Sequence, residues 1–168
     1  MRKDGREDLG VGSLEDEDLE EELREFVYRK LLNKFEVVSV ILIGSRARGD
    51  SLKGSDVDLL VILERCDMSY FERVQSIISL WKHRLVLNVF PYTTLETIRL
   101  TNRGFITVLD ALEHGVIIYD NGFFSRLREK FREALKSGII ARSKRGWWKV
   151  PTRKIVNNED IFGGKEET

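Results

Sequence analysis

The 168-residue sequence contains little of what stiffens or cross-links a chain: it has one cysteine, Cys66, and two prolines. A lone cysteine cannot form an intrachain disulfide, so a small secreted scaffold held together by disulfides is not expected. No histidine lies near Cys66 in the sequence. We therefore interpret Cys66 as a small apolar or surface residue and not as a catalytic thiol, which would need a neighbouring base.

Long apolar runs and net charge are absent too. No apolar run reaches the ~18 residues needed to cross a bilayer, and the N-terminal segment MRKDGREDLGVGS lacks the apolar core of a signal peptide. We therefore expect a cytoplasmic protein with no membrane partner. With 28 basic and 28 acidic residues, the formal net charge is zero, so overall charge favours neither nucleic acid nor a membrane surface.

The charges are nevertheless separated along the chain. Residues 15–22 (EDEDLEEE) are almost all acidic, whereas residues 136–154 contain seven lysines or arginines and no acidic residue. Such blocks usually form solvated faces or tails, and this is our main interpretation. The alternative is that the blocks dock on each other or on a partner molecule.

Hydrophobic periodicity predicts helices and strands in alternation. Ser13 is the predicted N-cap of a first helix that runs to about Lys34. Further helices are predicted at residues 68–82, 95–100, 105–113 and 123–135. Strands are predicted at residues 37–43, 56–63 and 85–90. Pro91 is expected to stop the last strand, and residues 116–119 form a short apolar run between turns. The sequence therefore predicts an α+β fold, with a small mixed sheet and helices packed on one side.

The segment IGSRARGDSLKGSDVDLLVI, residues 43–62, carries the chemistry. A strand ends there at Gly44-Ser45, where glycine permits an unusual backbone angle and close approach. A turn that leads into a helix presents backbone N–H groups suited to phosphate oxygens. The candidate nucleotide-binding residues are Gly44, Ser45, Arg46, Arg48, Gly49 and Ser55. A Walker-type phosphate loop is excluded, because Gly44 is not followed by Gly-Lys-Ser/Thr at the required spacing.

Asp56 and Asp58 follow directly, at the start of the second predicted strand. Side chains alternate along a strand, so both carboxylates project from the same face. Two such carboxylates repel each other, and Mg²⁺ relieves the repulsion while also binding substrate phosphates. The alternative is that Asp56 is a turn cap and Asp58 an exposed strand residue. Because a phosphate-receptive loop precedes them, we favour a metal site for phosphoryl or nucleotidyl transfer.

These residues resemble the motif of the DNA polymerase β-type nucleotidyltransferase superfamily. That family has Gly-Ser, ten intervening residues and Asp-x-Asp, and this chain has Gly44-Ser45, ten residues and Asp56-Val57-Asp58. The sequence GSRARGDS is typical of the minimal nucleotidyltransferases, a group within this superfamily. The motif covers about twenty residues, and the order of elements extends the resemblance to about residues 13–119.

The resemblance implies an enzyme that transfers a nucleoside monophosphate from a triphosphate to a hydroxyl acceptor. Gly44 and Ser45 would contact the triphosphate, ATP being favoured, and Asp56 and Asp58 would hold Mg²⁺, with Mn²⁺ as an alternative. Arg46 and Arg48 would be further phosphate contacts, although one of them could instead face solvent or an acidic partner. Some minimal members resemble antitoxins that adenylylate a helical ribonuclease toxin, the HEPN partner.

The chain departs from the family pattern at the third strand. The family places there a third carboxylate, which completes a second metal site and helps to deprotonate the acceptor hydroxyl. This chain reads LVLNVF, and the polar residue of that segment is Asn88. If Asn88 holds the position, its amide can ligate a metal weakly but cannot act as a base. The strand register also allows Val86, on the same face. The resemblance therefore leaves activity open, and a catalytically weakened, antitoxin-like binding module is the competing prediction.

The chain is expected to have four parts. These are a flexible arm at residues 1–12, a nucleotidyltransferase domain at 13–120, a C-terminal helix with a basic arm at 121–154, and a tail at 155–168. The arm surrounds Trp147-Trp148 with basic residues, a pattern that can hold single-stranded nucleic acid. We favour the alternative in which the tryptophans pack on the domain. An RNA-binding protein is accordingly the third functional hypothesis.

Overall fold

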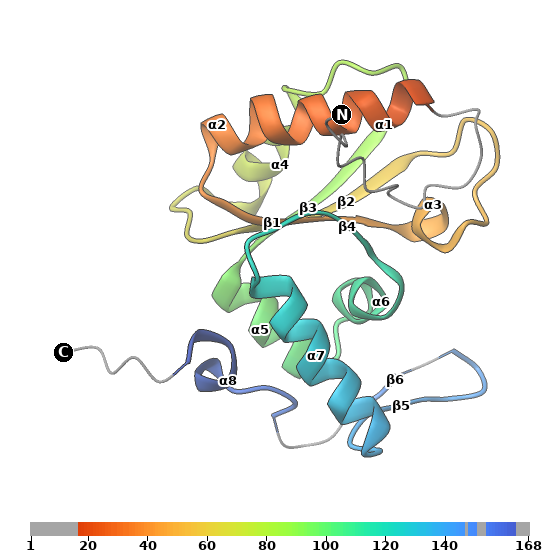
Figure 1. Ribbon diagram of the computed structural model, residues 1–168, viewed down its shortest axis with the longest axis vertical. Coiled ribbons are helices and arrows are strands. Elements are labelled where there is room, and N and C mark those ends of the chain that lie inside the picture. Colours follow the sequence, from red (N-terminus) through yellow and green to blue (C-terminus); the bar gives the residue numbers. More distant parts are fainter. Residues whose placement is uncertain (1–16, 147, 151–153, 164–168) are drawn as a thin grey trace, which may run out of the picture.

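A four-stranded mixed sheet lies at the centre of the computed structural model, which describes residues 17–146, 148–150 and 154–163 (Figure 1). The strands are β1 (Val37–Ile43), β2 (Val57–Leu63), β3 (Leu87–Thr93) and β4 (Val116–Asp120), in the spatial order β3-β2-β1-β4. β1 runs antiparallel to both of its neighbours, whereas β2 and β3 are parallel. The predicted fold class, α+β with a small mixed sheet, is confirmed.

Helices connect the strands. They are α1 (Glu17–Glu25), α2 (Leu32–Lys34), α3 (Gly44–Arg48), α4 (Tyr70–Ile78), α5 (Thr94–Asn102), α6 (Ile106–His114), α7 (Phe123–Lys136) and α8 (Asn158–Phe162). A π-helical turn, η2 (Phe26–Leu31), joins α1 to α2, so residues 17–34 form one continuous helix. Its buried residues recur every three or four positions and form one apolar stripe, which consists of Leu19, Leu23, Phe26, Val27 and Leu31. Ser13, the predicted N-cap, lies outside the described residues.

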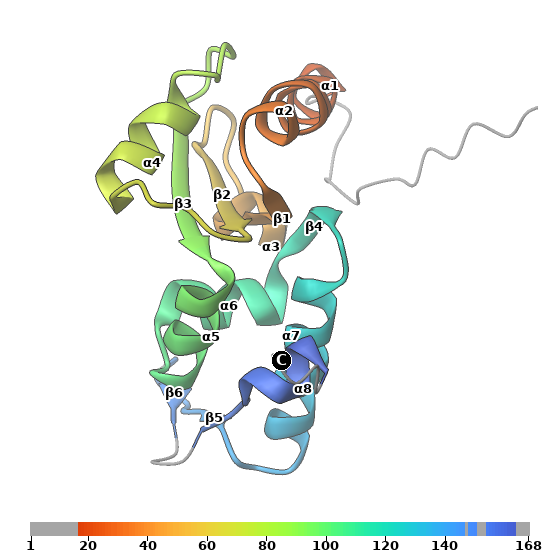
Figure 2. The same cartoon turned by 90° about the vertical axis from the view of Figure 1, so that its left-hand side faces the viewer.

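The helices cover both faces of the sheet, and in this respect the prediction of helices on one side is wrong. Alternate residues of β1 explain the arrangement, because Val40 and Leu42 face the first helix and α4 whereas Ile41 and Ile43 face α5, α6 and α7. Figures 1 and 2 show these two layers above and below the sheet. Every residue of β1 is buried, which is why its sequence reads VVSVILI instead of alternating with polar residues.

β3 continues through Pro91 to Thr93, so the expectation that Pro91 stops the strand is also wrong. β3 is an edge strand, and Val57 donates to the carbonyl of Val86. Backbone N–H and C=O groups point to alternate sides along β3. They point to β2 at Asn88, Phe90 and Tyr92, whereas the carbonyl of Pro91 points to the free edge. Proline is tolerated there because no N–H is needed. The Pro91 carbonyl accepts a hydrogen bond from Arg73 Nη1 at 3.3 Å.

Two segments are more ordered than expected. The apolar run 116–119 forms β4, which pairs with β1. Within the expected tail at 155–168, α8 packs on the core, and Val156 and Ile161 are buried against it. Packing therefore continues across the expected boundaries at residues 120 and 154. Residues 1–12, the expected flexible arm, lie outside the described residues, as do residues 164–168.

The basic C-terminal arm carries a short hairpin, β5 (Ala141–Arg142) with β6 (Trp148–Lys149). The Trp148 ring packs edge-on against Phe131, with centroids 5.6 Å apart, and its Nε1 donates to Asp110 at 3.4 Å. This tryptophan therefore packs on the domain, as the favoured interpretation stated, whereas Trp147 lies outside the described residues. Among the helices that the structure describes, none is long and apolar enough to cross a membrane.

Candidate functional site

The candidate site begins where β1 ends. Gly44 follows Ile43 directly and has φ 73°, a left-handed angle that favours glycine. A Cβ added at Gly44 would overlap Oδ2 of Asp58. Glycine is thus required here by its backbone angle and by close approach. This approach brings the Gly44-Ser45 turn against the carboxylate of Asp58.

The turn continues as α3, a five-residue helix that returns the chain towards β2. Gly49 ends it with φ 78° and donates its N–H to the carbonyl of Ser45. The Ser45 side chain is half-buried and forms no hydrogen bond within the part of the chain that the structure describes. Ser55 closes the following loop, because its Oγ accepts from the N–H of Leu52 at 2.9 Å. Gly49 and Ser55 therefore shape the loop that carries the candidate phosphate contacts.

The two arginines of α3 occupy different environments. Arg46 is 6% exposed, and its Nε and Nη2 donate to the carbonyl of Ser55 at 3.1 and 2.8 Å. This guanidinium therefore braces the loop between α3 and β2. Arg48 is exposed, with its Nε 3.4 Å from Oδ2 of Asp50. An exposed ion pair of this kind contributes little to stability, so Arg48 can exchange Asp50 for another anion.

Asp56, Asp58 and Asn88 meet at the same end of the sheet. In the register of the sheet, Asp58 lies between Ile43 of β1 and Asn88 of β3. Nδ2 of Asn88 lies 2.8 Å from Oδ1 of Asp58 and 3.3 Å from Oδ2 of Asp56. The amide thus donates to both carboxylates. The sequence left Asn88 and Val86 as alternatives, and the structure places Asn88 beside the carboxylate pair.

The donor set at this position fits a divalent cation held jointly with a substrate. Asp56 is exposed and Asp58 is half-buried, so both carboxylates are accessible from solvent. Mg²⁺ is commonly bound by one or two carboxylates that leave its other positions to water and phosphate oxygens. Among the described residues, no group of three or more histidine, cysteine or acidic side chains could hold a metal. The site therefore offers two carboxylates and an amide.

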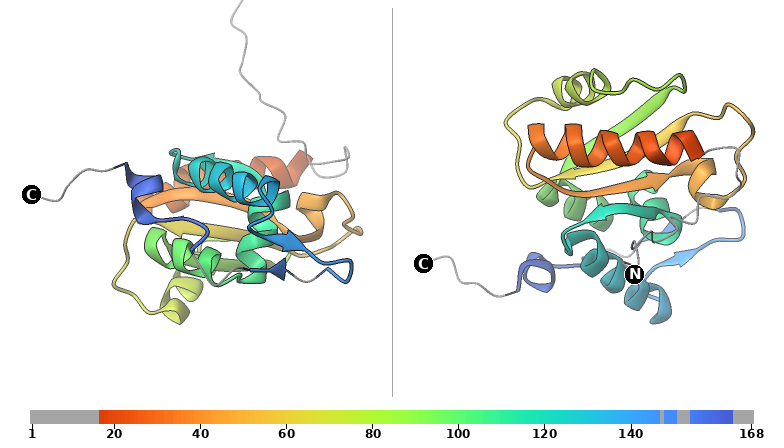
Figure 3. Two further views of the ribbon diagram at one scale, coloured as in Figure 1. Left: turned by 90° about the horizontal axis from the view of Figure 1, so that it is seen from below. Right: turned by 45° about the horizontal axis from the view of Figure 1, so that its top comes forward.

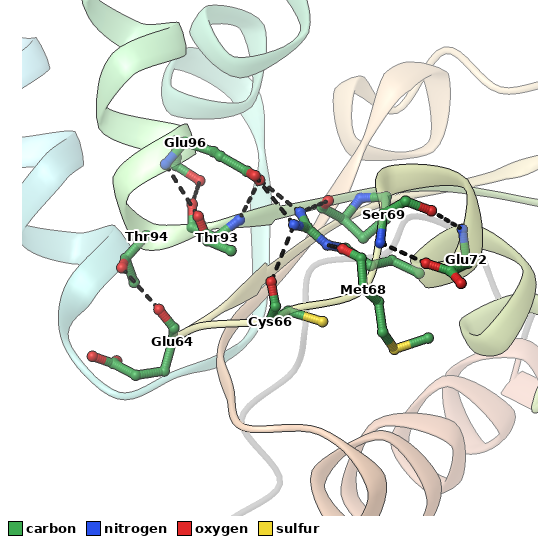
Figure 4. Close-up of polar contacts among 11 residues, drawn as sticks. Glu64, Cys66, Met68, Ser69, Glu72, Thr93, Thr94 and Glu96 are labelled. Atoms are coloured by element: carbon green, nitrogen blue, oxygen red, sulfur yellow. Dashed lines mark hydrogen bonds and ion pairs between the residues drawn. The ribbon is translucent and has the colours of Figure 1, made fainter.

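A second polar cluster, which the sequence analysis missed, lies at the other end of β3. The guanidinium of Arg73 is bonded to Glu96 at 2.7 Å and to the carbonyl of Met68 at 2.9 Å. Figure 4 shows Glu96 beside Thr93, which caps α5 through a reciprocal pair of hydrogen bonds. Burial would raise the pKa of Glu96, but the hydrogen bonds from Arg73 and Thr93 outweigh burial and lower it. The four-residue spacing from Arg73 to buried Ile77 on α4 indicates that Arg73 lies on the buried face, but it does not identify Glu96 as the partner.

The family of this chain is shown by its match to a family model. Residues 20–107 match the family model described as "Nucleotidyltransferase domain", which is 88 of the 168 residues (107 − 20 + 1). The chain therefore belongs to the nucleotidyltransferase domain family, and the resemblance to polymerase β-type nucleotidyltransferases is confirmed. The matched segment contains the Gly44-Ser45 turn, the Asp56/Asp58 pair and Asn88.

Solved structures provide a second comparison. A protein from Sulfolobus solfataricus, provisionally described as a nucleotidyltransferase, is similar at a TM-score of 0.46 and 20% identity, covering 62% of this chain and 82% of its own. A toxin–antitoxin complex with AMP-PNP is similar at a TM-score of 0.43 and 16% identity, covering 71% and 91%. No curated protein sequence matches the chain.

Proposed function

We propose that this protein is a magnesium-dependent nucleotidyltransferase that binds a nucleoside triphosphate, preferably ATP, and transfers its monophosphate to a hydroxyl acceptor on a partner protein. One observation carries the proposal: the Gly44-Ser45 turn, Asp56 and Asp58 converge at one end of the sheet. A phosphate-receptive turn beside a carboxylate pair is the arrangement that nucleotidyl transfer needs.

Each residue of this set has a distinct task in the proposal. Asp56 and Asp58 hold the cation, and a bound Mg²⁺ neutralises charge on the phosphates. Gly44 lets the triphosphate approach the backbone, and Ser45 and Arg48 donate to phosphate oxygens. In the transfer, the acceptor hydroxyl gives its proton to water and its oxygen bonds to the α-phosphorus, while the bond from that phosphorus to the oxygen that bridges to the β-phosphorus breaks, which releases pyrophosphate. Arg46 supports the loop from beneath.

Asn88 favours a second candidate function, a binding module with weakened chemistry. An amide cannot take the proton that the acceptor hydroxyl gives up. Its Nδ2 is 2.8 Å from Oδ1 of Asp58. The amide therefore donates hydrogen bonds to the carboxylates from the position where the family has a third acidic residue. In this candidate the fold binds the triphosphate and a partner, such as a helical ribonuclease toxin of the HEPN kind, but transfers slowly.

Intact-mass analysis separates the two candidates. The purified protein is incubated with Mg²⁺ and each triphosphate in turn, alone and with a co-expressed helical partner. A nucleotide-sized mass increase on the partner, absent with Asp58→Ala, is the expected result for the transferase. Triphosphate binding without any mass increase would favour the binding module. If the wild type showed neither triphosphate binding nor a mass increase, the site assignment would be overturned. Asp67→Ala, an exposed acidic residue outside the site, is the matched control.

A further inference from the structure

A basic surface is assembled from two segments that lie far apart in the sequence. Oδ1 of Asn102, at the end of α5, accepts from the N–H groups of Ile155 and Val156 at 2.8 and 3.0 Å, and its Nδ2 donates to the carbonyl of Val156 at 2.9 Å. Gly104 lies so close to Val150 that an added Cβ would overlap its side chain. The C-terminal segment is therefore fastened to the turn between α5 and α6.

These contacts bring four cations together. Arg99 and Arg103 are exposed on the last turn and C-cap of α5, and Lys149 and Lys154 are exposed one residue from Val150 and Ile155. Across the residues that the structure describes, these four side chains form no ion pair. We call Arg99, Arg103, Lys149 and Lys154 the basic surface.

Three carboxylates on α5 and α6 are already engaged by other side chains. Glu96 binds Arg73, Glu113 binds Arg142 at 3.0 Å, and Asp110 accepts from Trp148. The described part of the acidic block, residues 17–22, lies on α1, across the sheet from α5 and the hairpin, as Figures 1 and 3 show. Although the net charge is zero, the acidic residues of α1 and the basic surface therefore lie on opposite sides of the sheet. A surface of this kind attracts polyanions.

A row of aromatic rings begins at Phe105, two residues after Arg103 of the basic surface. Phe105 follows Gly104 directly and is 39% exposed. The centroid of its ring lies 6.3 Å from that of Tyr92, and the Tyr92 centroid lies 5.5 Å from that of Tyr70, so the three rings form a row from the N-cap of α6 across β3 to α4. Tyr70 is 43% exposed. The elements α4, β3, α5 and β6 lie along the same side of the molecule, on the left of Figure 2.

We propose that the basic surface and this aromatic row bind single-stranded nucleic acid. Its phosphates contact the cations, and its unpaired bases stack on Phe105 and Tyr70, since exposed rings beside cations bind single strands without sequence preference. An acidic protein segment would match the cations, but a single strand carries a flat base with every phosphate and so matches both the cations and the rings. Tyr92 and Asn88 share one face of β3 and are four residues apart, about 13 Å, so the bound strand lies next to the candidate site.

Fluorescence anisotropy with the full chain tests this inference. The probes are labelled oligouridylate and oligothymidylate of about 12 nucleotides, within the site size of single-strand binders. We expect binding at about 50 mM salt, with log K falling by about 0.7 per phosphate contact for each unit of log salt. Four cations give a slope of about −3. Equal binding of both probes would indicate phosphate and base contacts alone, and stronger binding of RNA an additional contact to the 2′-hydroxyl.

Charge reversal and ring removal have different expected signatures. Arg103→Glu with Lys149→Glu should weaken binding about a hundredfold at this salt and flatten the slope. Phe105→Ala should weaken it about tenfold with the slope unchanged. The matched control is Arg29→Glu with Lys34→Glu, two exposed cations on the first helix, which should bind as the wild type does. Thermal melts of every variant confirm that it is folded.

Several outcomes would overturn the inference. The first is that the wild type does not bind the probes, and the second is that both double variants lose the same affinity for them. The third is that polyglutamate of matched charge competes as well as the oligonucleotide, which would indicate an acidic protein partner. Asp58→Ala should bind the probes normally. Its loss of triphosphate binding tests the proposed function separately, so the two hypotheses can fail independently.

Discussion

The two ends of the parallel β2–β3 pair carry polar clusters of opposite character. At the start of the strands, Asn88 bridges Asp56 and Asp58 in a position open to solvent. At the far end, the guanidinium of Arg73 is 7% exposed and is enclosed by Glu96 and by backbone carbonyls. We call the first, made of Asp56, Asp58 and Asn88, the open cluster, and the second, made of Arg73 and Glu96 with their partners, the enclosed cluster. The charges of the enclosed cluster balance each other, whereas the carboxylates of the open cluster have no cationic partner among the described residues.

This difference distinguishes a structural cluster from a functional one. A buried arginine is stable only if its charge and its donors are satisfied, and Arg73 meets this condition through carbonyls of the loop before α4 and of β3 and through the carboxylate of Glu96 on α5. The pair of Asp56 and Asp58 receives no cation from the described residues, and an amide supplies the hydrogen bonds between them. A carboxylate pair left without a cation by its own chain is suited to one that arrives with a substrate.

The largest expected effect is at the open cluster. Asp58→Ala should abolish magnesium-dependent triphosphate binding, because it removes a charge that holds the cation and the side chain packed against Gly44. Its thermal stability should change little, since the carboxylate is half-buried and has no cationic partner in the described structure. Titration calorimetry with ATP and Mg²⁺ measures the binding. Affinity equal to the wild type would remove Asp58 from the site.

A variant of the enclosed cluster should lose stability and keep triphosphate binding. Arg73→Met keeps the aliphatic stem but leaves Glu96 without its partner, and it should lower the free energy of unfolding by about 2–4 kcal/mol. Triphosphate binding by the folded fraction should be retained. Arg65→Met is the control, because Arg65 pairs with Glu36 in an exposed ion pair and should change stability by about 0.5 kcal/mol or less. Urea unfolding measures both variants, and equal losses would contradict the contrast.

The open cluster can also be made more like a three-carboxylate site. Asn88→Asp replaces the bridging amide with a group that can ligate a cation and accept a proton, so nucleotidyl transfer should rise by about tenfold or more. Without divalent cation, the added charge should lower the thermal midpoint, and Mg²⁺ should restore it. Asn88→Ala removes the amide without adding charge and should show neither effect. Pyrophosphate release that stays at the wild-type level would argue against the positional match of Asn88.

The sequence predicts most elements of this fold because their signals are local. β1 is found at its predicted bounds, residues 37–43, and α7 differs from its prediction by one residue, since a β-branched run and a regular apolar stripe each specify one structure. Pro91 was misjudged because its effect depends on whether β3 is an edge strand, which its neighbours in sequence do not reveal. The same limit applies to residues 116–119, which became β4 only by pairing with β1.

The candidate site was predicted from the motif, but the roles within it were not separated. Gly44 and the Asp56/Asp58 pair follow from backbone angle and alternation along a strand. Arg46 and Arg48 are equivalent in sequence, and only the tertiary structure buries one against Ser55 and leaves the other exposed. The contact of Arg73 with Glu96 spans 23 residues, so no local pattern identifies it.

The smallest expected effect is a pH dependence that belongs to the enclosed cluster. The folded pKa of Glu96 lies below its ordinary value of 4.5 because hydrogen bonds from Arg73 and Thr93 outweigh burial. A lowered folded pKa contributes stability that is complete above the unfolded pKa and is lost as pH falls through the folded one. The wild type should therefore lose more stability between neutral pH and strong acid than Glu96→Gln, which has no carboxylate to titrate.

The difference should be no more than about 1 kcal/mol, because the Glu96 side chain is 36% exposed and solvent screens its interaction with Arg73. Thermal midpoints measured across the acid range give the comparison, with Glu25→Gln on the exposed side of the first helix as the control. Glu72 and Asp120, whose pKa values are also lowered, titrate in every variant and cancel. Parallel pH profiles for the wild type and Glu96→Gln would show that Arg73 is held by backbone carbonyls alone.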